Sequence, residues 1–154
     1  MAPDLLHLTL VFLGNTDSER VPDIASALAR VAQRQAPFDA AISGAGGRVD
    51  DRPNARRGGV VWLTLADGAP ETSALMLDVD RELDSRTYDE KHRPRPHLTV
   101  ARNARSETLA ALRQAASTLR IGWPVDRIVL FRSHTGPRGS RYEELSSHAL
   151  LGSR

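Results

Sequence analysis

The tripeptide His-Leu-Thr occurs twice in this chain, as His7-Leu8-Thr9 and as His97-Leu98-Thr99, and each copy opens a short apolar stretch. With five histidines, nineteen leucines and nine threonines among 154 residues, chance would give far fewer than one such tripeptide. Runs of this length and composition are typical of strands. The repeat therefore predicts two strands, over residues 5–13 and 97–102, in matching structural contexts.

Apolar residues elsewhere repeat with the period of a helix in three segments and form short extended runs between them. Glycine and arginine dominate residues 44–59, which we expect to form a hairpin loop. The predicted helices span 21–36, 70–83 and 107–119, and the other predicted strands span 38–43, 60–65, 125–133 and 142–145.

The order of these elements is strand, helix, strands and helix, followed by strand, helix and strands, so that one unit repeats roughly once. A chain of 154 residues fits one domain. Interleaved helices and strands in this order indicate an α+β protein. We expect residues 1–154 to form a single domain of two pseudo-symmetric lobes, each bringing one strand to a shared cleft.

Side chains alternate across a strand, so His7 and Thr9 would project from one face while Leu8 projects from the other, and the second copy repeats this. Two imidazoles facing one space suit hydrolysis of a cyclic phosphodiester. One neutral histidine can take a proton from water while its protonated partner gives one to the leaving oxygen. Thr9 and Thr99 could donate hydrogen bonds to the non-bridging phosphate oxygens.

A single His-x-Thr on a strand would more often be structural, and it is the pair that favours chemistry. A metal site usually needs three or four ligands, and neither motif has another histidine or a carboxylate at ligand spacing. No metal or other cofactor is therefore expected. The absence of cysteine excludes a disulfide framework and a thiolate nucleophile.

The net charge of +2 does not by itself indicate a nucleic-acid partner. Twenty of the twenty-one basic residues are arginine, with Lys91 the exception. Arginine suits forked phosphate contacts, but a GC-rich coding bias explains its excess equally well. No apolar stretch approaches the roughly 20 residues that cross a bilayer, and the first residues do not resemble a signal peptide. We expect a cytoplasmic protein with no membrane contact.

Residues 3–14, 95–102 and 128–133, with Gly139 and Tyr142, resemble the two-histidine (2H) phosphoesterase superfamily. Within it they are similar to the LigT-like branch, the RNA 2′,3′-cyclic phosphodiesterases also called the 2′-5′ RNA ligase family. The first two stretches match the family's two motif regions, and the third matches its closing hairpin. The resemblance covers nearly the whole chain.

The resemblance implies a bilobal fold in which two antiparallel sheets line a central cleft, with the helices outside. It implies hydrolysis of 2′,3′-cyclic phosphate on RNA 3′ ends or nucleotides to a 2′-phosphate, without metal and without an obligatory protein partner. In the family, the first-motif histidine donates the proton and the second accepts it. His7 would then be the acid and His97 the base, although the two near-symmetric motifs do not themselves assign these roles.

Members of the family carry a further strand and helix before the first motif, which begins here at His7. Either Met1 is a misassigned or engineered start, or this element is missing from the N-terminal lobe. The second alternative would leave a sheet edge uncovered and weaken the positioning of His7. An uncovered sheet edge invites pairing with another chain, so a dimer or a marginally stable protein is expected. A stable monomer in sedimentation would contradict this expectation.

Arg102 follows the second motif and matches the family pattern, which makes it a candidate phosphate ligand beside Thr9 and Thr99. Strict alternation would point it away from His97 unless a bulge intervenes.

A contact with the RNA backbone and a solvated loop are equally compatible with Arg86, Lys91, Arg93 and Arg95. For Arg48, Arg52, Arg56 and Arg57 the solvated loop is favoured. A terminal base could stack on Tyr142 or Phe131, although Phe131 could equally belong to the core. No partner motif accompanies His92, His134 and His148, which we expect to be structural or exposed, with His134 the best placed of the three to approach the cleft.

Two functions compete with catalysis on RNA ends. The chain could be a noncatalytic module that binds RNA ends, or an esterase for a small cyclic nucleotide that is not RNA. Both motifs are intact, which favours catalysis over binding alone.

Overall fold

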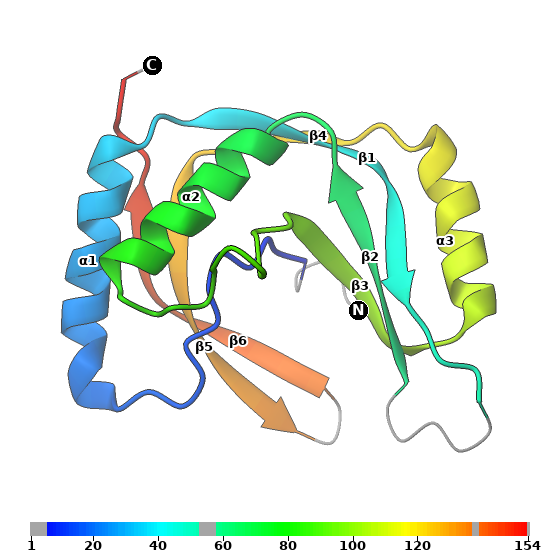
Figure 1. Cartoon of the computed structure of the whole chain (residues 1–154). Coiled ribbons are helices and arrows are strands. Elements are labelled where there is room, and N and C mark those ends of the chain that lie inside the picture. The colour runs from blue at the N-terminus through cyan, green and yellow to red at the C-terminus, as the bar shows by residue number, and fades with distance from the viewer. Residues whose placement is uncertain (1–5, 53–57, 137–138, 154) are drawn as a thin grey trace. The chain divides into compact units, whose positions relative to one another are not determined.

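The computed structural model describes residues 6–52, 58–136 and 139–153, which divide into two compact units. Unit 1 contains the N-terminal segment up to Thr9, Asp39–Pro70 and Arg95–Trp123, and unit 2 contains Leu10–Phe38, Glu71–Pro94 and the chain from Pro124 onward. Helices α1, α2 and α3 accompany a four-stranded and a two-stranded sheet (Figure 1). The predicted α+β class, with two antiparallel sheets, is confirmed.

Unit 1 is built on the four-stranded sheet, whose strand order is β3-β2-β1-β4. Both β1 and β3 pair antiparallel with β2, which therefore lies inside the sheet. The four strands are β1 (Phe38–Arg48), β2 (Gly59–Leu65), β3 (His97–Ala104) and β4 (Gly122–Val125).

The sheet of unit 1 has one buried face and one partly exposed face. Along β2, Val61, Leu63 and Leu65 are buried, while the alternate residues Val60, Trp62 and Thr64 are partly exposed. Helix α3 (Ser106–Thr118) packs on the buried face, where its Leu109 forms a core cluster with Val61. The other face stays accessible for chemistry.

The first turn of α3 is held by a carboxylate from outside the helix. The backbone N–H of Ser106 donates a hydrogen bond to the Asp51 side chain at 3.0 Å. Hydrogen bonds from Ser106 lower the pKa of Asp51. A negative charge at this end also suits the helix dipole, so Asp51 fixes where β3 gives way to α3.

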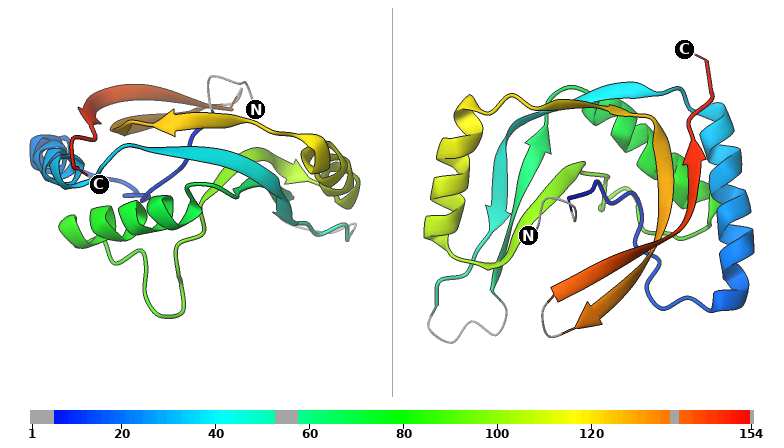
Figure 2. Two further views of the ribbon diagram at one scale, coloured as in Figure 1. Left: turned by 90° about the horizontal axis from the view of Figure 1, so that it is seen from above. Right: turned by 180° about the vertical axis from the view of Figure 1, so that it is seen from behind.

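Unit 2 contains α1 (Val21–Arg34), α2 (Ala69–Glu82), which begins at the end of unit 1, and the antiparallel pair β5 (Arg127–Gly136) and β6 (Gly139–Ala149). Figure 2 shows α1 running beside β6. The apolar face of α1 packs against residues of α2 and β5, which gives this unit a core of its own. That core contains Ile24, Leu28, Val31, Ala32, Leu75, Val79, Ile128 and Leu150.

Salt bridges tie α1 to α2 on the surface of unit 2. The Arg30 and Arg34 guanidinium groups each lie 2.7 Å from a carboxylate oxygen of Glu82. These contacts lower the pKa of Glu82. No helix in the described ranges is both long and apolar enough to span a bilayer.

The three predicted helices are confirmed to within a few residues, and so are the strands predicted over 60–65, 97–102 and 125–133, but the other strands needed correction. Of the strand predicted over residues 5–13, the described part contains only an isolated bridge at Leu8. The loop predicted over 44–59 is wrong at its start, because β1 continues to Arg48, and β4 was not predicted. Glycines usually indicate loops, but in β1 they make room for bulky neighbours: a Cβ on Gly47 would lie 2.9 Å from Leu109.

Candidate active site

The second motif lies at the start of β3. His97 pairs with Thr64 of β2, Leu98 with Leu63, and Thr99 with Trp62. Leu98 is buried, whereas His97 and Thr99 are only partly buried. The alternation expected from the sequence therefore holds, and the imidazole and hydroxyl of this motif share the accessible face of the sheet.

The first motif meets the second in the same unit. Leu8 forms an antiparallel bridge with Leu98, on the edge of β3 away from β2. Opposed residues of an antiparallel pair project to the same face, so Leu8 shares the buried side with Leu98. The direction of the bridge sets His7 across from Thr99 and Thr9 across from His97.

This arrangement differs from the expectation that each motif belongs to a different half of the protein. Both tripeptides lie in unit 1, and the chain enters unit 2 immediately after Thr9. A bridge between two identical tripeptides running in opposite directions gives a local two-fold pattern. Extended by one residue in each direction, this pattern pairs each histidine with the threonine of the other motif.

Arg102 lies on the same face of the sheet as His97 and Thr99. The register of β3 against β2 shifts between Val61 and Trp62, so Val61 pairs with Ala101 and Val60 with Arg102. An extra residue of this kind reverses the alternation that follows it. Val60 belongs to the accessible set of β2, so the shift turns Arg102 toward the motif face, contrary to strict alternation.

Arg48 of β1 lies across β2 from Arg102, because Val60 of β2 pairs with both arginines. Both arginines are exposed. Arg48 and Arg102 therefore place two guanidinium groups at one end of the face that carries the second motif. Guanidinium groups are well suited to binding phosphate oxygens.

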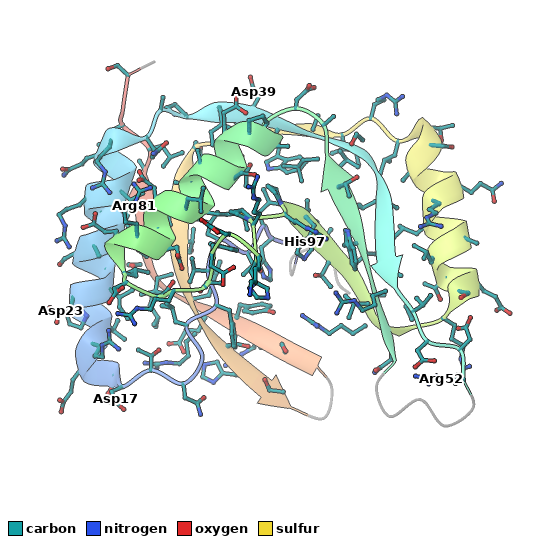
Figure 3. All side chains as sticks on the ribbon, viewed as in Figure 1. Asp17, Asp23, Asp39, Arg52, Arg81 and His97 are labelled. Atoms are coloured by element: carbon teal, nitrogen blue, oxygen red, sulfur yellow. The ribbon has the colours of Figure 1, made fainter. Side chains whose placement is uncertain are left out.

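The ring of His97 is oriented by two neighbours. Its Nδ1 lies 2.6 Å from the carbonyl oxygen of Arg95, and because a carbonyl can only accept, Nδ1 carries the proton. The Nε2 atom is then the one that can take up a proton. The Trp62 ring lies beside the imidazole, with 5.6 Å between ring centroids and 56° between ring planes. Figure 3 shows His97 at the beginning of β3.

The first motif is fixed just beyond its end, within unit 2. The Tyr88 hydroxyl donates a hydrogen bond to the carbonyl oxygen of Leu10, the residue after Thr9. Burial, and then the charge of Asp80, raise the pKa of Tyr88. The phenol thus remains a donor across the neutral pH range.

Asp80 in turn organises the segment that carries Tyr88. Its buried carboxylate accepts hydrogen bonds from the Ser85 hydroxyl and, at 2.7 Å, from the Thr87 N–H. Burial by itself would raise the pKa of Asp80, but the hydrogen bonds from Ser85, Thr87 and Tyr88 outweigh it and lower the pKa. A charged, buried anchor therefore holds the turn after α2.

Most of the remaining candidates from the sequence have local partners. Arg56 and Arg57 lie outside the described residues, and Lys91, Arg93 and Arg95 are exposed. The local pairs are Arg52 with Asp50, Arg86 with Asp84, His92 with Asp89, His134 with Glu143, His148 with Ser146, and Phe131 with Tyr142.

Metal ligands and surface hollows could also mark a site. Within the described segments, no group of three or more histidine, aspartate or glutamate side chains could hold a metal ion. A hollow of about 260 Å³ in unit 2 is lined by residues of the segment from Phe12 to Thr16, of the start of α1 and of the turn at Leu83. None of the motif residues lines it.

Trp62 is the neighbour that sequence reasoning missed. It stood in the predicted strand 60–65, where an aromatic residue is equally typical of a core. The sequence did contain one indication: Trp62 alternates with the apolar Val61 and Leu63, which puts it on the opposite, partly exposed face of the strand. Only the pairing of β2 with β3 brings it to His97.

Residues 3–137 match the family model described as the 2'-5' RNA ligase superfamily. The chain is 30% identical over 154 residues to an RNA 2',3'-cyclic phosphodiesterase of Thermus thermophilus, covering 97% of this chain and 74% of that protein. It is 32% identical over 152 residues to a protein of the same name from Geobacillus stearothermophilus, covering 95% of this chain and 46% of that protein.

Two solved structures are similar in fold. The crystal structure of TT0787 of Thermus thermophilus has a TM-score of 0.69 at 28% identity and covers 100% of this chain and 82% of that one. The crystal structure of E. coli LigT complexed with 3'-AMP has a TM-score of 0.70 at 24% identity, covering 97% of this chain and 79% of that one. The antiparallel sheets of this chain are thus part of a known architecture.

Proposed function

Because the chain belongs to the 2'-5' RNA ligase superfamily, we propose that it hydrolyses 2′,3′-cyclic phosphates at RNA 3′ ends or on nucleotides to 2′-phosphates, with His7 and His97 as acid and base. Relatives named RNA 2',3'-cyclic phosphodiesterase support the reaction. The observation that carries the proposal for the residues is the bridge from Leu8 to Leu98, which joins the two motifs on one sheet edge.

The reaction needs one proton taken and one proton given. In the direction that the family resemblance implies, Nε2 of His97 takes a proton from water as the water oxygen attacks phosphorus. The bond from phosphorus to the ribose O3′ breaks, and His7 protonates that oxygen. The product is a 2′-phosphate, and exchange with solvent restores the two histidines. No metal takes part in this scheme.

The threonines and Arg102 stabilise the phosphate. Continued outward from the bridge at Leu8, an antiparallel register would put each threonine opposite the histidine of the other motif. In this scheme its hydroxyl donates to a non-bridging oxygen as negative charge accumulates there. Arg102 supplies a full positive charge and a forked set of donors on the same face as His97 and Thr99. The neighbouring Arg48 lies where the phosphate backbone of a longer RNA could continue.

The test is turnover of a 2′,3′-cyclic mononucleotide and of a short RNA ending in 2′,3′-cyclic phosphate, each with and without chelator. The product is identified by ³¹P NMR as a 2′- or a 3′-phosphate. We expect a 2′-phosphate, no effect of the chelator, and a bell-shaped pH dependence of kcat/KM. Loss of activity with chelator, or a rate that does not change with pH through neutrality, would contradict the acid–base scheme.

Single substitutions His7→Ala and His97→Ala should each lower turnover by at least about 10²-fold. His134→Ala is the matched control, since His134 lies in β5 and bonds to Glu143. Arg102→Ala should mainly raise KM, because it removes a phosphate contact rather than a proton carrier. Tight binding of the RNA end without turnover by the wild type would favour a noncatalytic module, and turnover of the mononucleotide alone would favour a small-nucleotide esterase.

A further inference from the structure

Trp62 occupies the centre of the accessible face of the unit 1 sheet. It pairs with Thr99 of β3 on one side and with Gly46 of β1 on the other. Its ring lies beside that of His97, with centroids 5.6 Å apart. No role for it follows from the acid–base scheme, since it carries no group that exchanges a proton near neutral pH.

Gly46 explains how so large a ring can lie there. A Cβ on Gly46 would lie 2.6 Å from Nε1 of Trp62 and 2.8 Å from its Cε2, well inside contact distance. The indole therefore rests on backbone that carries no side chain. Any other residue at this position would force the indole or the backbone of β1 to shift, because contacts this short do not occur in folded proteins.

Gly44 provides a natural comparison two residues earlier on the same face. A Cβ there would lie 3.3 Å from the hydroxyl oxygen of Thr64, a contact that a small adjustment relieves. Gly44 pairs with Thr64 and Gly46 with Trp62 in the same register. The two glycines differ, therefore, in whether they touch Trp62.

We propose that Trp62, seated on Gly46, is a positioning residue for His97. The Arg95 carbonyl holds Nδ1–H at one side of the imidazole, and the indole limits rotation of the ring at another. Nε2 is thereby kept as the atom that exchanges the proton. When His97 becomes an imidazolium during the reaction, an indole within about 6 Å of a cation also favours that charge. This inference rests on the proposed function.

The test compares Trp62→Leu, Trp62→Phe and Gly46→Ala with the control Gly44→Ala. We expect Trp62→Leu and Gly46→Ala to lower kcat about tenfold with little change in KM, since a cation–π contact and a fixed ring act on the charged state. Trp62→Phe, which keeps an aromatic ring, should recover part of the loss. Gly44→Ala should stay within about twofold of the wild type.

A second readout does not depend on turnover. Histidine ring signals in ¹H–¹⁵N NMR report which nitrogen carries the proton, and His97→Ala identifies the signals of His97. The wild type should show protonation at Nδ1, and Trp62→Leu and Gly46→Ala should show a mixture of tautomers. Urea unfolding of each variant identifies any that does not fold. If Trp62→Leu does not fold, Trp62→Phe and Gly46→Ala test the positioning role.

The two proposals can fail separately. An inactive wild type that still shows the Trp62-dependent tautomer of His97 would remove the proposed reaction and leave the positioning role. An active enzyme whose kcat and His97 signals are the same in wild type, Trp62→Leu and Gly46→Ala would remove the positioning role alone.

Discussion

The two His-Leu-Thr tripeptides have the same sequence but different structural support. His97 and Thr99 belong to β3, which pairs residue by residue with β2, whereas His7 and Thr9 flank a single bridge at Leu8. Leu98 is 8% exposed, while Leu8 is only partly buried. A short motif therefore specifies which chemical groups are present, and the surrounding chain decides how firmly each is held.

The largest expected effects test whether two differently supported motifs act as one unit. His7→Gln and His97→Gln should each lower kcat/KM about 10²- to 10⁴-fold, the range for loss of a general acid or base. The kcat/KM of the double variant should be close to that of the less active single variant, because removing either histidine already interrupts the proton transfer. The measurement is steady-state turnover of a 2′,3′-cyclic nucleotide.

Additive losses in the double variant would contradict this prediction, since they would mean that each histidine contributes independently. A loss confined to His97→Gln would show that the firmly held motif carries the reaction alone.

The contrast also shows what the sequence could and could not reveal. The repeat and its alternation sufficed to put His97 and Thr99 on one face, because the period of a strand is a local property. The position of Arg102 depends on a register shift against β2, which no local pattern in β3 encodes. The bridge between Leu8 and Leu98 joins residues far apart in the chain, so the sequence indicated the two motifs but not their antiparallel contact.

The same limit applies to the glycines of β1. A glycine-rich sequence such as that of Gly44, Gly46 and Gly47 usually indicates a loop. That these glycines leave room for neighbouring side chains becomes clear only when the strand pairing is known. Helices were easier to predict: Ile24, Leu28 and Val31 repeat with a helical period, and their burial against the core of unit 2 follows from that repeat alone.

The next largest effect compares the two motif leucines. Leu98→Ala should lower the free energy of unfolding by about 2–4 kcal/mol, because it leaves a cavity in a packed sheet. Leu8→Ala should cost roughly half as much, since Leu8 keeps part of its surface in water. Urea denaturation of both variants measures the difference. Equal costs would show that the first motif is packed as firmly as the second.

Asp80 supports the first motif indirectly, because it stabilises the turn that carries Tyr88, and Tyr88 binds the carbonyl of Leu10. Asp80→Asn should lower the free energy of unfolding by about 1–3 kcal/mol at neutral pH, since an amide replaces a charged acceptor of several hydrogen bonds. Urea denaturation as a function of pH measures this.

The pH dependence of that loss has a definite sign. The pKa of Asp80 is lowered in the folded protein, so its contribution is complete above the unfolded value of about 3.9 and disappears as the pH falls through the lower, folded value. Wild type and Asp80→Asn should therefore converge in stability in acid. A difference that persists unchanged to the lowest pH would mean that the side chain acts through its shape and not through its charge.

The smallest expected effect isolates the contact that follows the first motif. Tyr88→Phe removes only the hydroxyl that donates to the Leu10 carbonyl, and a single hydrogen bond of this kind contributes about 1 kcal/mol net. If this hydrogen bond positions His7 and Thr9 as the pairing with β2 positions the second motif, kcat of Tyr88→Phe should fall a few-fold. The tautomer of His97 should stay unchanged. Turnover and ring NMR of the same variant separate the two motifs. A fall in stability with no change in kcat would show that the bridge at Leu8 suffices to hold the first motif in place.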